Sequence, residues 1–141
     1  MNSRELLERL ISFDTTSAVS NLALIHFVQA YLASYGVESS LVHDESGQKA
    51  NLYATIGSAN KAGVMLSGHT DVVPVKGQAW SSDPFVLTER DGLLYGRGSC
   101  DMKGFIASCL AAVPALTQAK LHTPVHLALS YDEEVGCLGV R

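Results

Sequence analysis

Gly96-Arg97-Gly98-Ser99-Cys100-Asp101-Met102-Lys103-Gly104 is the stretch that decides how this chain folds. It joins a short apolar run, typical of a strand (residues 93–95), to a run rich in Ala and Leu that predicts a helix over residues 105–116. The carboxylate of Asp101 lies at this junction. Because α/β proteins bind ligands where strands end and helices begin, we interpret the stretch as part of a functional site.

Two further polar clusters follow apolar runs in the same way. Ser67-Gly68-His69-Thr70-Asp71 comes after Val64-Met65-Leu66, a continuous apolar run that predicts a strand buried on both faces. Tyr131-Asp132-Glu133-Glu134 comes after the strand predicted over residues 125–130. We expect the three clusters to meet in space around metal ions.

The remaining pattern predicts the architecture around these clusters. Apolar residues at helical spacing predict helices over residues 3–12 and 21–35, the second closed by Gly36 in a left-handed cap. Strands are predicted over residues 37–43 and 51–56, and Arg90-Asp91-Gly92 predicts a hairpin turn. The expected fold class is α/β, with helices packed on the faces of a mixed β-sheet.

Composition narrows the class of protein. A hydrophobic fraction of 47% and a charged fraction of 17% are typical of a globular domain, and the net charge of −4 gives no reason to expect nucleic acid or a membrane as partner. The odd number of cysteines predicts reduced thiols and a cytoplasmic location. We interpret Cys100 and Cys137 as small buried hydrophobes rather than as ligands.

His69 and Asp71 can act as a pair. Residues i and i+2 of an extended segment project to the same side. A histidine that binds a metal usually donates its other ring N–H to a carboxylate, which fixes its tautomer. The alternative for this motif alone is a surface turn.

The carboxylates of the other two clusters suit a cation. A phosphate-binding loop is disfavoured at Asp101, because Lys103 is followed by Gly104 rather than by Ser or Thr. Glu133 and Glu134 would repel each other unless a positive charge offset them. Adjacent side chains point in different directions, so one can bind a metal while the other takes a proton from an attacking water. Simple alternatives are a helix cap for Asp101 and a solvated loop for the glutamates.

These segments resemble the M20 family of dizinc amidohydrolases and peptidases. The likeness rests on residues 67–74, 94–104 and 132–136, with Trp80 and Asp83-Pro84-Phe85 in support, and it extends over essentially the whole chain. The resemblance implies a dizinc-peptidase-like catalytic domain and two divalent metal ions, Zn²⁺ or Co²⁺. It assigns ligand roles to three residues and supporting roles to two: His69, Asp101 (bridging) and Glu134 as ligands, Glu133 as general base and Asp71 as the residue that orients His69. It also implies a cis peptide bond after Asp101.

The resemblance implies a function as well. It points to hydrolysis of the amide bond of an N-acyl amino acid. The substrate it favours is N2-acetyl-L-ornithine, which would be converted to L-ornithine and acetate in arginine biosynthesis. Alternatives are another M20 activity, such as desuccinylation of succinyl-diaminopimelate or peptide hydrolysis, and a non-catalytic, weakly metal-binding fragment. The family's lid domain, used for dimerisation, and its C-terminal ligands have no counterpart in residues 1–141. We therefore expect an incomplete, inactive N-terminal portion of a catalytic domain whose complete form is a homodimer.

The other histidines are weaker candidates. His26 lies opposite the apolar face of its helix, and His43 ends an exposed strand. His122 and His126 have i, i+4 spacing, but Pro124 between them argues against a helical ligand pair. Arg97 and Lys103 are expected to tether nearby backbone or carboxylates.

Overall fold

The computed structural model describes residues 1–140 and has the predicted α/β class. Its α-helices are α1 (Ser3–Ile11), α2 (Leu22–Ala33) and α3 (Lys103–Gln118), and a short 3₁₀ helix, η1, spans Leu138–Val140. The first helix begins with a capping box, in which Asn2 and Glu5 each bond the other's backbone N–H. Gly36 adopts a φ of 72° after α2, as its predicted role requires.

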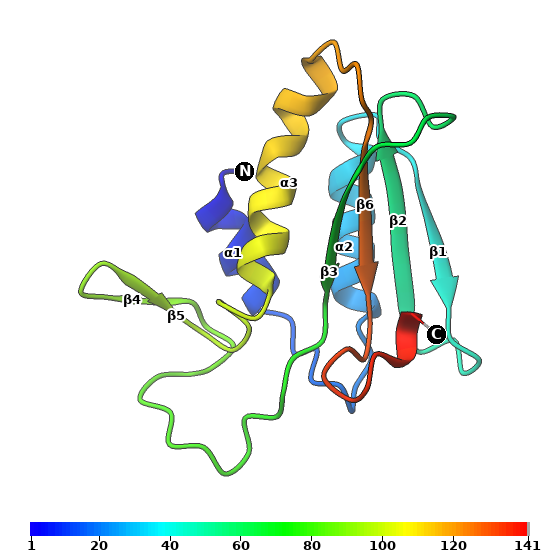
Figure 1. Cartoon of the computed structure of the whole chain (residues 1–141). Coiled ribbons are helices and arrows are strands. Elements are labelled where there is room, and N and C mark those ends of the chain that lie inside the picture. Colours follow the sequence, from blue (N-terminus) through cyan, green and yellow to red (C-terminus); the bar gives the residue numbers. More distant parts are fainter. Residues whose placement is uncertain (141) are drawn as a thin grey trace.

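Four strands form a mixed sheet in the order β1-β2-β6-β3. They are β1 (Ser39–His43), β2 (Ala50–Ile56), β3 (Val64–His69) and β6 (Val125–Ser130). β2 pairs antiparallel with β1 and with β6, whereas β3 and β6 are parallel and place His69 opposite Ser130. Both parallel strands point downward in Figure 1, so their carboxyl ends lie at the same edge of the sheet. Two of the polar clusters are thereby brought together.

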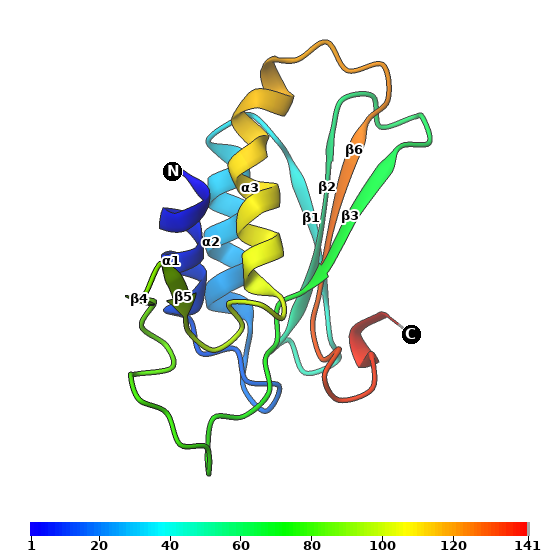
Figure 2. The same cartoon turned by 60° about the vertical axis from the view of Figure 1, so that its left-hand side comes forward.

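In the described part of the chain, all three α-helices lie on one face of this sheet (Figure 2). The core between helices and sheet is built from alternate residues of the strands. In β2, for example, Leu52 and Ala54 are buried against the helices while Tyr53 between them is exposed. Tyr31 of α2 adds a polar link, because its hydroxyl donates to the carbonyl of Leu110 in α3.

The prediction that residues 64–66 are buried on both faces is wrong. β3 lies at the edge of the sheet as described, and the side chains of Val64 and Met65 are each 55% exposed. An apolar run cannot distinguish a strand enclosed by helices from one with a free face, since that depends on what packs there. Cys100 and Cys137 are also exposed rather than buried, whereas Cys109 is buried in α3.

The strand before Asp101 does not belong to the main sheet. β4 (Thr88–Arg90) and β5 (Leu93–Tyr95) form a separate hairpin about the predicted turn at residues 90–92. Two glycines then let the chain turn tightly into α3. Gly98 has a φ of 83°, and a Cβ there would lie 2.7 Å from a methyl of Val72; a Cβ on Gly104 would lie 2.3 Å from the Ser99 carbonyl.

None of the helices within residues 1–140 has the length and apolar character needed to cross a bilayer.

Candidate metal centre

His69 is the last residue of β3 and only 5% exposed. Its Nδ1 lies 3.0 Å from the backbone oxygen of Asp71 and 3.4 Å from Asp71 Oδ1. A carbonyl can only accept, so Nδ1 carries the proton of this hydrogen bond. The other ring nitrogen, Nε2, lies 2.9 Å from Asp101 Oδ1 and 3.8 Å from Glu133 Oε2. The imidazole thus presents Nε2 to a group of carboxylates.

Asp71 is a buried carboxylate with an unusually complete set of donors. Oδ1 accepts from the Glu133 backbone N–H at 3.0 Å, and Oδ2 accepts from the Glu134 backbone N–H at 3.1 Å and the Ser17 hydroxyl at 2.8 Å. Burial raises the pKa of Asp71, but these hydrogen bonds and the one from His69 outweigh it and lower the pKa to about 2. Asp71 is therefore ionised and fixes both His69 and the turn after β6.

The turn after β6 brings both glutamates to His69. Ligand atoms of His69, Glu133 and Glu134 all lie within 4.8 Å of one another. Asp101 joins this group from the turn before α3 through its contact with His69 Nε2, and its side chain is 74% exposed. The peptide bond between Asp101 and Met102 is cis, as the family resemblance implied. All the residues predicted for the site therefore gather at one place, although they come from three separate segments.

The charges at this place favour a cation. Hydrogen bonds to Asp71 and Asp101 raise the pKa of His69 to about 9, with the Asp71 side chain the largest cause and burial opposing it. The pKa of Glu134 is raised by burial first and then by the nearby carboxylate of Asp101. Carboxylates that lie this close to each other are stabilised by a positive charge among them.

The donor set fits a divalent metal of borderline or hard character. Imidazole nitrogen with carboxylate oxygens is the combination that Zn²⁺ accepts, and within residues 1–140 no thiolate takes part in the cluster. His69 Nε2, Glu133, Glu134 and Asp101 are the groups that can hold such an ion, with Asp71 orienting the ring behind it.

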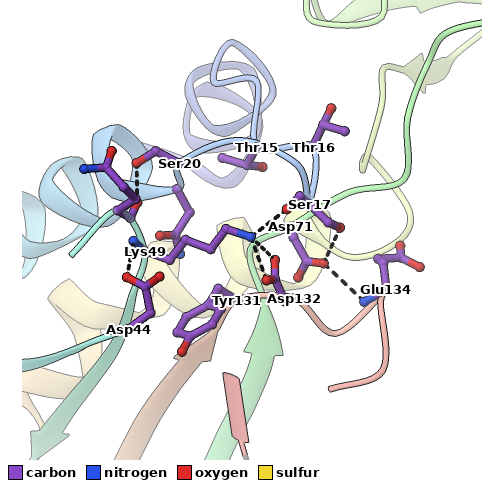
Figure 3. Close-up of polar contacts among 12 residues, drawn as sticks. Thr15, Thr16, Ser17, Ser20, Asp44, Lys49, Asp71, Tyr131, Asp132 and Glu134 are labelled. Atoms are coloured by element: carbon purple, nitrogen blue, oxygen red, sulfur yellow. Dashed lines mark hydrogen bonds and ion pairs between the residues drawn. The ribbon is translucent and has the colours of Figure 1, made fainter. Parts of the chain in front are cut away.

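A second polar cluster lies next to Asp71, and the sequence did not indicate it (Figure 3). The ammonium of Lys49, which precedes β2, donates to both carboxylate oxygens of Asp132 at 2.5 and 2.6 Å. It also donates to the carbonyl of Ser17 at 2.6 Å. Asp132 is 7% exposed. The acidic character of residues 132–134 was a usable signal for a buried cation, but nothing in the sequence specified Lys49.

The tether to the backbone expected of Lys103 is present, whereas the side chain of Arg97 contacts an amide oxygen and an aromatic ring instead of backbone or a carboxylate. Lys103 is fully buried and donates to the Phe13 carbonyl at 2.7 Å, and burial lowers its pKa to about 8. Arg97 stacks on the ring of Trp80 at 5.1 Å and donates to Gln78.

The other histidines lie outside the cluster. His26 and His43 are exposed, as expected. His126 is buried in β6, where its Nδ1 meets the hydroxyls of Tyr53 and Thr55, each at 2.9 Å.

Comparison with known proteins identifies the family. Residues 65–141 match the model of peptidase family M20/M25/M40. Among curated relatives, the acetylornithine deacetylase of Myxococcus xanthus is 43% identical over 98% of this chain, and that of Pasteurella multocida is 39% identical over 97%. The chain spans 37% of the length of each of these relatives.

Solved structures agree with the fold. Human carnosine dipeptidase 1 superposes with a TM-score of 0.84 and 27% identity, over 98% of this chain and 33% of that one. An M20 family metallo-carboxypeptidase from Sulfolobus solfataricus gives a TM-score of 0.80 and 25% identity, over 96% of this chain and 32% of that one. Both of these structures share the fold of this chain. The chain belongs to the M20/M25/M40 peptidase family.

Proposed function

We propose that the protein carrying this chain is a metal-dependent amidohydrolase that cleaves N-acyl amino acids, with N2-acetyl-L-ornithine as its substrate. The observation that carries the proposal is the convergence of His69, Glu133 and Glu134 within 4.8 Å, with Asp101 on His69 Nε2. The choice of substrate is supported by the curated relatives, which are named acetylornithine deacetylases at 39–43% identity.

The residues have distinct roles in this proposal. Of two ions of Zn²⁺ or Co²⁺, His69 would bind one, Glu134 would bind the other, and Asp101 would bind both. Such ions polarise the amide carbonyl and make water a better nucleophile at neutral pH. Glu133, whose side chain is 47% exposed and lies 3.8 Å from His69 Nε2, takes the proton of the attacking water and delivers it to the leaving amine. Asp71 keeps the His69 ring oriented throughout.

A deacylation panel on the complete protein tests this function. N2-acetyl-L-ornithine is expected to be turned over faster than N-succinyl-diaminopimelate and than dipeptides. Glu133→Gln is expected to reduce kcat by at least about 100-fold, since general acid–base catalysis contributes 10²–10⁴-fold, while metal content measured by elemental analysis stays near that of the wild type. Wild-type kcat in this variant would contradict the role of Glu133, and faster desuccinylation or peptide cleavage would identify a different M20 activity.

A second candidate function is metal binding without catalysis by this chain on its own. It is favoured by the exposure of the site, since the Asp101 side chain is 74% and that of Glu133 47% exposed, whereas hydrolytic sites generally exclude bulk water. Metal analysis of the 141-residue chain separates the two, because two tightly held ions per chain would argue against this candidate.

The proposed function carries expectations about the cell. An enzyme that releases ornithine from its acetyl derivative belongs in arginine biosynthesis and in the cytoplasm. We propose further that the complete protein is a homodimer, which size-exclusion chromatography with light scattering tests directly.

A further inference from the structure

The ammonium of Lys49 lies in the middle of the buried polar cluster next to Asp71 (Figure 3). It contacts both oxygens of Asp132 and the carbonyl of Ser17, all within 2.6 Å. The side chains of Lys49 and Asp132 are only 16% and 10% exposed. A buried pair of this kind is costly to break from one side, because the remaining charge is left without a partner. Lys49 therefore fastens its two partners firmly.

Both partners of Lys49 belong to segments that donate hydrogen bonds to Asp71. Ser17 donates its hydroxyl to Asp71 Oδ2, and Asp132 directly precedes the two residues whose backbone N–H groups donate to Asp71. The loop after α1 and the turn after β6 thus converge on one carboxylate. Lys49 joins the same two segments a second time, through the Ser17 carbonyl and the Asp132 carboxylate.

The backbone conformation of Asp132 gives a reason for the ion pair with Lys49. Its φ of 55° lies in the left-handed region, which non-glycine residues adopt at a cost. This conformation turns the chain so that two successive N–H groups, of Glu133 and Glu134, face Asp71. Lys49 is itself held in place, because its backbone N–H donates to Asp44 Oδ1 at 2.9 Å.

We propose that Lys49 is a positioning residue of the hydrolytic site. It has no hydrogen bond or ion pair with His69, Asp101, Glu133 or Glu134, and it acts through Asp132 and Ser17 on the Asp71 carboxylate. Asp71 in turn holds the His69 ring and the turn that carries both glutamates. The inference rests on the proposed amidohydrolase function for its kinetic consequence, whereas its structural consequence is independent of that function.

The test compares Lys49→Met with Lys61→Met in the complete, metal-loaded protein. Lys61 is exposed, and its side chain has no hydrogen bond or ion pair within residues 1–140, so its variant controls for loss of one positive charge. Lys49→Met is expected to lower kcat by about 10- to 100-fold, the range seen when residues supporting metal ligands are changed, with KM much less affected. Amide hydrogen exchange at Glu133 and Glu134 is expected to accelerate, with no change at Leu127 in β6. Lys49→Arg, which keeps the charge, should recover part of the loss.

Asp132→Asn and the double variant test whether Lys49 acts through Asp132. The double variant is expected to lose no more kcat than Lys49→Met alone, because coupled residues are not additive. If Lys49→Met fails to fold, Asp132→Asn carries the same comparison of kcat and exchange. Exchange and kcat equal to those of Lys61→Met would overturn the inference. If the wild type hydrolyses no acyl amino acid, the proposed function fails, and the exchange rates alone then decide for or against the positioning role.

Discussion

His69 is the residue on which the site converges, and its two ring nitrogens have different surroundings. Nδ1 faces Asp71, which is buried and ionised, while Nε2 faces Asp101 and Glu133 near the surface. Asp71 therefore fixes the orientation of the ring through Nδ1, and Nε2 is the nitrogen available to a metal. This is the arrangement expected of a metal-binding histidine with an orienting carboxylate.

Metal binding is expected to release about one proton from His69 at pH 7.5. The pKa of about 9 means that the ring is protonated in the metal-free protein, and a metal can bind Nε2 only after that proton leaves. Titration calorimetry with Zn²⁺ in buffers of different ionisation enthalpy measures the number released. Asp71→Asn removes the largest cause of the raised pKa, so this variant should release fewer protons at pH 8. A wild-type heat independent of buffer would contradict the prediction.

The same pKa has a consequence for stability without metal. The pKa of His69 in the folded protein lies above the ordinary value of 6.5. Protonation of His69 therefore contributes its full stabilisation of the metal-free protein below pH 6.5. The contribution is lost as the pH rises through about 9.

At the scale of the single residue, sequence predicted much of the site. His69 and Asp71 were recognisable because their spacing on an extended segment places them together, and Glu133 and Glu134 because adjacent acids need a nearby positive charge. Lys49 was not recognisable. It is 83 residues away from Asp132, and a lysine before a strand is ordinarily solvated.

At the scale of elements, the turn at residues 96–104 does more than join a strand to a helix. β5 lies in a hairpin outside the main sheet, so Asp101 reaches the site by way of the turn and the start of α3. Lys103 holds that start in place through its bond to the Phe13 carbonyl. Asp101 was thus correctly predicted to lie with the other two clusters. The strand before it, however, is not part of the main sheet.

Gly98→Ala is expected to destabilise the protein by more than about 1–3 kcal/mol, the cost of a left-handed backbone for a non-glycine residue. The new Cβ would also lie 2.7 Å from buried Val72, which adds a clash. Gly47→Ala is the matched control, because Gly47 has a similar φ of 69° and nothing within 4 Å of its Cβ position. Urea unfolding measures both. Equal losses in the two variants would show that the approach to Val72 is unimportant.

At the scale of the whole molecule, the site joins three separate parts of the chain. Its groups come from the end of β3, the turn before α3 and the turn after β6. A metal held by all three cross-links them in the native state and has no such site in the unfolded chain. Metal binding should therefore stabilise the whole protein.

Zn²⁺ at 100 times its Kd is expected to stabilise the protein by about 2.7 kcal/mol and so to raise Tm by several degrees. Calorimetric melting with and without the metal measures the shift, and EDTA should reverse it. In His69→Ala the shift should be largely absent, because the most buried of the clustered groups is removed. An unchanged shift in that variant would place the stabilising metal elsewhere.

Sequence by itself determined the fold class and the hairpin turn, through hydrophobic period and turn chemistry. It also predicted which residues gather at the site, from the side chains that attract a cation and from the resemblance to the M20 family. Tertiary structure alone decided that β3 has an exposed face, that β5 stands apart from the main sheet, and that Lys49 pairs with Asp132. Each depends on which distant segments meet, and the hydrophobic pattern of a segment does not record what packs against it. Asp101 illustrates both contributions. The sequence of its own turn identifies it as a candidate metal ligand, whereas its contact with His69 depends on the tertiary structure.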